Sequence, residues 1–234
     1  IFTNHSVFSI GHSNTGARSL GLGHANLTLT DLWSANNNQA GLAHVKEFGF
    51  GFAYENRFGL SELSLKNLNL ALPIKWGTFG LTVQQFGFTD YNENKFGLAY
   101  GLNVSKNVSL GIQLDYLLIS VGEAQTQNKS GLTAEIGLLA KVTDKLKLGA
   151  HIYNFPNSSL SGEFEEKIPM IIRLGLNYEF SKKLFAVVDI EKNISGIGIE
   201  NLKNRLNLIY KDNYIFNVSK DKNVYCTSVK INLV

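Results

Sequence analysis

The five histidines are the residues best suited to bind a metal, and their spacing does not form a metal site. They are His5, His12, His24, His44 and His151. No two of them stand two or four residues apart, as ligands on one strand or helix would, and the single cysteine, Cys226, offers no thiolate pair. Four of the five lie within residues 1–47, where hydrogen bonding to the backbone is their more ordinary role. We therefore expect no metal and no other cofactor.

Nucleophilic and phosphate chemistry have no better support. The chain contains no Gly-x-Ser-x-Gly turn and no phosphate-binding loop. The Gly21-Leu22-Gly23 triplet is not a dinucleotide-binding fingerprint, because no strand–turn–helix pattern surrounds it. Some outer-membrane barrels do carry a Ser or Asp/His pair at their rim, but nothing in this sequence marks one. The sequence predicts a protein that is not an enzyme.

Composition narrows the class of protein. The formal net charge of +3 is too small and too dispersed to indicate nucleic-acid binding. No apolar run approaches the roughly 18 residues of a spanning helix, and the mean hydropathy is −0.03. The chain begins at Ile1 without the apolar region of a signal peptide, so a signal peptide has been removed or never existed. If the chain enters a membrane, we expect it to do so as a β-barrel.

From residue 48 onward the apolar residues alternate with other residues, which is the pattern of β-strands. Phe48, Phe50, Phe52 and Tyr54 alternate in this way, and so do the apolar residues of 96–104, 132–140 and 172–180. These segments are about ten residues long, which exceeds the roughly five or six of soluble sheets and fits the 9–11 of a tilted membrane strand.

The two faces of these strands differ in a way that favours a membrane barrel. One face carries bulky Phe, Leu, Ile and Tyr, and the other carries Gly and Ala with single charges. Lipid outside and a narrow polar lumen inside would produce this division. A soluble, secreted β-sandwich is the alternative. The charges on the small-residue face are Glu55, Lys95, Asp115, Glu135, Lys147, Arg173, Glu179 and Asp189.

Connection lengths predict the number of strands. Turns of about three residues, such as Lys75–Gly77, alternate with longer connections, of which Phe155–Ile168 is the longest. If the first strand begins at Phe48 and residues 195–210 form one long strand, the barrel has 12 strands, the last at Val224–Val234. A hairpin around Lys203 within residues 195–210, or strands contributed by the N-terminal segment, would raise the count to 14. Trp76 lies at a short turn, where an indole would meet the lipid interface.

Residues 1–47 differ from the rest, so we divide the chain into an N-terminal segment, 1–47, and a barrel, 48–234. The segment is dense in Gly and Asn, which indicates turns and close backbone approaches, not a regular element. Such a segment in front of a barrel whose inner face carries small residues suggests a plug, or hatch, inside the lumen.

Two motifs in this segment resemble a known family. The run Gly16-Ala17-Arg18-Ser19-Leu20-Gly21-Leu22-Gly23-His24-Ala25, followed by Asn38-Gln39-Ala40-Gly41-Leu42-Ala43, resembles the entry segment of the PorV/PorQ group of the FadL-like barrel superfamily. Gln39 stands where most members have proline. The alternating segment 169–192 is also similar to the family, whereas the likeness weakens after about residue 200.

The resemblance implies a plugged barrel of 12 to 14 strands in the bacterial outer membrane. By analogy, Arg18, Asp31, Asn38 and Gly41 would be plug residues held by lumen charges such as Glu135 and Arg173. PorV-like members serve the type IX secretion system, and FadL-like members pass hydrophobic compounds through a gap in the barrel wall. Fold alone does not decide between these functions.

We therefore carry two functional hypotheses. The first is an accessory barrel, in contact with membrane lipid, within a larger outer-membrane protein complex for secretion, assembly or surface display. The alternative is a FadL-like transporter for hydrophobic small molecules, with an apolar pocket between plug and wall and a kink in a strand, for which Phe48–Tyr54 is the candidate.

Overall fold

The computed structural model describes residues 15–56, 59–89, 91–121, 127–161 and 166–194, together with two C-terminal strands, 214–221 and 224–231. The main element is a sheet of nine antiparallel strands in the order β1-β2-β3-β4-β5-β6-β7-β10-β11. Its strands are β1 (Gly49–Asn56), β2 (Ser64–Ile74), β3 (Gly77–Gly87), β4 (Tyr91–Asn103), β5 (Val108–Val121), β6 (Gln127–Lys141), β7 (Leu146–Tyr153), β10 (Ile171–Ser181) and β11 (Leu184–Asn193). The predicted all-β, antiparallel fold is confirmed.

The connections follow the predicted alternation of short and long except between β3 and β4, where a longer connection, Thr89–Asn94, was predicted and only residues 88–90 separate the strands. The short ones after β2, β4, β6 and β10 all lie at one end of the sheet, because successive strands are antiparallel. The longest predicted loop, Phe155–Ile168, was wrong in part, since it contains the paired two-residue strands β8 (Ser159–Leu160) and β9 (Glu166–Lys167). β8 and β9 pair with each other in a two-stranded sheet of their own, and strands of two residues are too short for side-chain alternation to indicate.

The predicted strand count remains a prediction. Residues 195–210, on which it depends, lie outside the described residues. The last two strands, β12 (Tyr214–Asp221) and β13 (Val224–Ile231), pair with each other in a separate two-stranded sheet. In the described part of the chain, β1 and β11 are therefore the two edges of the main sheet.

Side chains divide between the faces of the sheet as the alternation predicts. Bulky apolar residues point away from the interior, and Phe50, for example, is 74% exposed. The same face exposes Phe52, Leu81, Leu98, Leu114, Leu132, Leu174 and Ile190. The opposite face buries at least one polar residue from each strand from β2 to β10: Asn69, Thr82, Lys95, Gln113, Glu135, His151 and Arg173. This order is the inverse of a water-soluble sheet, which turns its apolar face inward.

The N-terminal segment contains regular structure that we did not predict. It forms two short α-helices, α1 (Ala17–Gly21) and α2 (Ser34–Asn37), and a 3₁₀-helix, η1 (Gln39–His44). A further 3₁₀ turn, η2 (Ser61–Leu63), precedes β2. Helices of four to six residues bury no long apolar stripe, so periodicity could not reveal them. None of the described helices has the length and apolar character needed to cross a bilayer.

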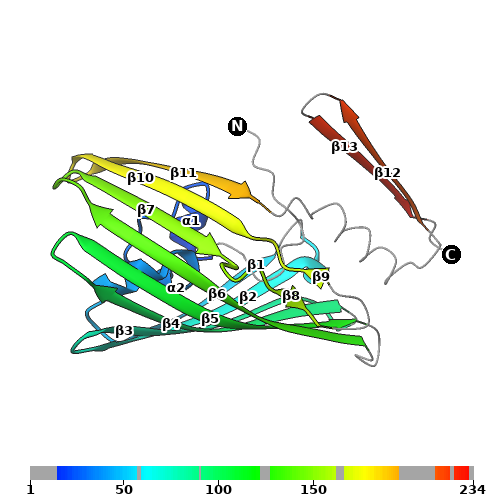
Figure 1. The fold of residues 1–234 in the computed structure, drawn as a ribbon, viewed down its shortest axis with the longest axis horizontal. Coiled ribbons are helices and arrows are strands. Elements are labelled where there is room, and N and C mark those ends of the chain that lie inside the picture. The colour runs from blue at the N-terminus through cyan, green and yellow to red at the C-terminus, as the bar shows by residue number, and fades with distance from the viewer. Residues whose placement is uncertain are drawn as a thin grey trace.

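These helices lie against the inner face of the sheet, which curves around them (Figure 1). Close approach depends on glycines of the wall. A Cβ at Gly137 of β6 would overlap the side-chain oxygen of Asn38, and one at Gly111 of β5 would overlap the backbone of Gln39. The backbone of η1 can therefore rest directly on the strands because these two positions lack a side chain.

The pairing of β1 shows no β-bulge at the candidate kink, Phe48–Tyr54. β1 pairs with β2 from Gly49 to Asn56 without a register shift. Its glycines meet the N-terminal segment instead, since a Cβ at Gly51 would lie 2.7 Å from Leu32. The one register shift among the main-sheet pairings that are given lies in β10, between Glu179 and Ser181.

Candidate functional site

A cluster of buried charges lies on the inner face, beside the N-terminal segment. We call Lys95 (β4), Asp115 (β5), Glu135 (β6) and His151 (β7) the charge cluster. Lys95 donates to Glu135 Oε1 at 2.6 Å and lies 3.5 Å from Asp115. His151 Nε2 is 2.9 Å from Glu135 Oε2. All four side chains are at least 96% buried, so each ion depends on its neighbours instead of on water.

Gln39 connects this cluster to the N-terminal segment. Its amide nitrogen donates to Glu135 Oε2 at 2.6 Å and to the carbonyl oxygen of Ala35 at 3.2 Å. Glu135 thus receives hydrogen bonds from η1, β4 and β7 at once. Proline, which most members of the resembled family have at this position, could not make this contact because it has no side-chain donor.

A second contact, which we call the clamp, is formed by Arg173 of β10 and Asp189 of β11. Asp189 Oδ2 accepts hydrogen bonds from the backbone N–H groups of Asn26 and Leu27 at 2.7 and 3.0 Å. Arg173 donates to Asn26 Oδ1 at 2.8 Å and to the carbonyl oxygen of Asn37 at 3.3 Å. The clamp therefore holds the segment at two places that are distant in sequence.

Asn38 makes hydrogen bonds both within the N-terminal segment and to the main sheet. Its side-chain oxygen accepts from the N–H of Ala40 at the start of η1, which is a standard helix cap. Its side-chain nitrogen donates to the carbonyl oxygens of Leu27, within the segment, and Leu138, on β6. One amide thus orders the segment and attaches it to the wall.

The other predicted plug residues make contacts within their own segment. Arg18 pairs with Asp31 at 3.5 Å, and both side chains are partly exposed. A Cβ at Gly41 would meet Ser34 and the carbonyl oxygen of Leu29. Trp76 is 76% exposed in the turn between β2 and β3.

Several residues of the segment, the charge cluster and the clamp were not among our predicted site residues. They are Gln39, Lys95, His151 and Asp189, together with Asn36, whose side chain donates to Asn69 of β2 at 2.8 Å. A usable signal was present for two of them and also for Asp115. Lys95, Asp115 and Asp189 occupy the small-residue face, and a lone charge among glycines on that face needs a partner across the interior.

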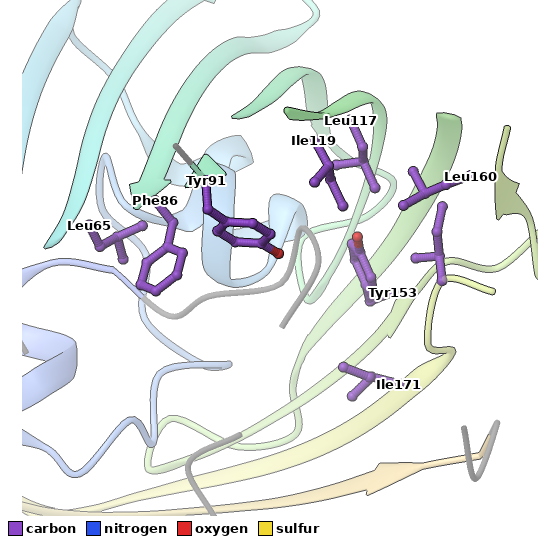
Figure 2. Packing of buried hydrophobic residues seen from close by; sticks show 9 residues of the cluster. Leu65, Phe86, Tyr91, Leu117, Ile119, Tyr153, Leu160 and Ile171 are labelled. Carbon is purple, nitrogen blue, oxygen red and sulfur yellow. The ribbon is translucent and has the colours of Figure 1, made fainter. Parts of the chain in front are cut away.

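Next to the charge cluster, the inner face becomes apolar. Here nine buried residues form what we call the apolar layer: Leu65, Phe86, Tyr91, Leu117, Ile119, Tyr153, Leu160, Ile168 and Ile171. Figure 2 shows Phe86 and Tyr91 on one side of the interior and Leu117, Ile119 and Tyr153 on the other. The two regions adjoin, since Lys95 is paired in register with Leu117 and its ammonium lies 5.4 Å from the ring centre of Tyr153.

The one Ser–His contact that we find in the described part of the chain does not suggest catalysis. His44 Nε2 is 3.0 Å from Ser109 Oγ, but Ser109 is 2% exposed and its hydroxyl donates to Asn103. Burial, together with the positive charges of Lys147 and Lys46, lowers the pKa of His44. No group of three or more His, Cys, Asp or Glu residues is placed to hold a metal within the described ranges.

Solved structures of similar fold are outer-membrane channels. The chain is similar to the structure entitled CymD monoaromatic hydrocarbon channel, with a TM-score of 0.56 and 14% identity over 80% of this chain and 70% of that chain. It is similar also to a Pseudomonas aeruginosa FadL homologue, with a TM-score of 0.55, 13% identity and the same coverage. No family model and no curated protein sequence matches the chain. The chain is therefore similar in fold to these two proteins, whereas the PorV-like assignment stays a prediction.

Proposed function

We propose that the protein is an outer-membrane channel for hydrophobic molecules, with residues 15–47 as its plug. The observation that carries the proposal is the apolar layer. A water-filled pore has a polar lining, whereas nine apolar or aromatic residues gather here, seven of them on the inner face of the main sheet. The FadL-type fold supports the same function, which we had held as the alternative to an accessory barrel.

The outer face supports a place in the membrane. Its exposed Phe and Leu side chains would be costly in water and are suited to lipid. Aromatic residues also gather near the short-turn end, where Trp76 lies. Phe79 and Tyr100 are 4.8 Å apart between ring centres, and Tyr178 and Phe180 are 4.9 Å apart. This is the arrangement of an aromatic belt at a membrane interface.

Uptake by intact cells tests the proposal. Cells with a lipopolysaccharide outer leaflet admit hydrophobic compounds slowly, so a channel should accelerate the entry of a radiolabelled neutral compound. We expect faster uptake with this protein than with an empty vector, and an intermediate rate with Leu117→Gln, which places an amide in the apolar layer. Equal rates for cells with and without the folded protein would exclude the channel function.

The accessory role is the second candidate, and it depends on the resemblance to PorV-like proteins. It requires a stable protein partner, as a type IX secretion component would be. Purification from native membranes in mild detergent distinguishes the two roles. A stoichiometric partner, with uptake unaffected by deletion of the gene, would favour the accessory subunit over the channel.

A further inference from the structure

The charges at the border of the apolar layer affect which hydrophobic molecules the layer can bind. This inference rests on the proposed channel function. We propose that the channel selects uncharged molecules and rejects hydrophobic anions such as fatty carboxylates. A carboxylate that enters an apolar region needs a cation to receive it, because an unpaired buried charge is strongly unfavourable. The question is therefore whether any described cation at this site is free.

Lys95, whose ammonium lies 5.4 Å from the ring centre of Tyr153 in the layer, is already neutralised. Its ammonium contacts Glu135 at 2.6 Å and Asp115 at 3.5 Å. Its side chain is 4% exposed, so it cannot turn towards solvent without leaving both carboxylates. A ligand carboxylate would have to displace one of two buried carboxylates that are fixed on neighbouring strands.

Arg173 is the second buried cation, two residues from Ile171 of the apolar layer. It lies 3.5 Å from Asp189 and 3.4 Å from Glu191, and its remaining donors face Asn26 and the backbone of the N-terminal segment. Lys129, which lies beside Ile119 in register and is also buried, is not free either. Thus no described buried cation is available to a ligand.

The excess charge at this site is negative. Lys95 and Arg173 together face four carboxylates, those of Asp115, Glu135, Asp189 and Glu191, so carboxylates outnumber cations at these contacts. A further carboxylate, Glu93, accepts a hydrogen bond at 2.6 Å from the hydroxyl of Tyr91, a residue of the layer. Glu93 and Lys129 flank Ile119 in register and add one charge of each sign, so an incoming anion would meet repulsion from the carboxylates around Lys95 and Arg173.

Competition binding with ligands of matched chain length tests the proposal. Purified protein in neutral detergent is loaded with the uncharged fluorescent probe N-phenyl-1-naphthylamine. The probe is displaced with decanol, methyl decanoate or decanoate at a pH where the carboxylate is ionised. We expect both neutral ligands to displace the probe at about ten-fold lower concentration than decanoate, or lower still. Equal or stronger displacement by decanoate would overturn the proposal while leaving the channel function intact.

Two variants of equal charge change locate the selectivity. Glu93→Gln keeps an acceptor for Tyr91 but removes one negative charge beside the layer, and we expect it to improve decanoate binding about three-fold with little effect on decanol. Glu179→Gln removes a charge from the partly exposed pair with Lys147 and should change neither. If both variants improve decanoate binding equally, the overall charge is responsible and the local assignment is wrong. If neither the probe nor any ligand binds, the proposed function itself fails.

Discussion

The charge cluster and the apolar layer adjoin on the same inner face, yet they hold different kinds of partner. The charge cluster joins ions from four strands, and Glu135 binds Gln39 of the N-terminal segment. The apolar layer brings together side chains from β2 to β10 with few hydrogen-bonding groups. The first region fastens the chain to itself, whereas the second is the region to which the proposed channel function assigns the hydrophobic molecule.

The largest expected effect is the loss of Glu135. In Glu135→Ala, Lys95 and His151 lose a buried partner and Gln39 loses its acceptor, so we expect a loss of about 3–5 kcal/mol in stability. Thermal unfolding in detergent measures this loss. We also expect trypsin to cleave after Arg18, which is already 56% exposed, faster in the variant.

The matched control for that variant is Glu179→Ala. Glu179 pairs with Lys147 at 3.0 Å, but both side chains are partly exposed, so the loss should be only about 0–1 kcal/mol. A comparable loss in the two variants would show that burial of the cluster is not what makes it important.

The next effect concerns the contact between η1 and the wall. In Gly137→Ala the new methyl group overlaps Asn38, and we expect the stability to fall by about 1–3 kcal/mol as η1 shifts. Gly21→Ala in α1 is the control, because nothing lies within 4 Å of the added Cβ. Unchanged melting and unchanged proteolysis of Gly137→Ala would contradict the close packing of η1 on β6.

A smaller effect is expected in the apolar layer. Leu117→Ala removes apolar surface from the layer, and we expect neutral ligands to bind about 1–2 kcal/mol more weakly. Probe titration measures this change. The N-terminal segment should keep its resistance to trypsin, since Leu117 is not one of its attachments. Release of the segment in this variant would remove the distinction between the two regions.

The smallest effect is expected for Arg18→Ala. The pair with Asp31 has a distance of 3.5 Å and lies at the surface, so its loss should cost about 0–1 kcal/mol. A melting curve within error of the wild-type curve would agree with this. A loss as large as that of Glu135→Ala would mean that the segment is held mainly by its own exposed pair and not by the wall.

Much of the wall could be predicted because a strand has a period of two. Phe50 and Phe52 had to share one face, and Lys95 and Glu135 had to fall on the small-residue face, whatever the strand order. The helices of the N-terminal segment could not be predicted, because α1, α2 and η1 are too short to show a period. Their order depends on caps such as Asn38 and on attachment to the wall.

The sequence by itself determined which residues alternate, where the turns fall, and that the bulky face and the ionic face are opposite. Only the tertiary structure decided which charges meet. Lys95 and Glu135 are 40 positions apart and lie on strands separated by β5, so no local pattern relates them. The same holds for Asp189 and the backbone of Asn26. Such contacts arise from strand register and sheet curvature, which are properties of the folded chain as a whole.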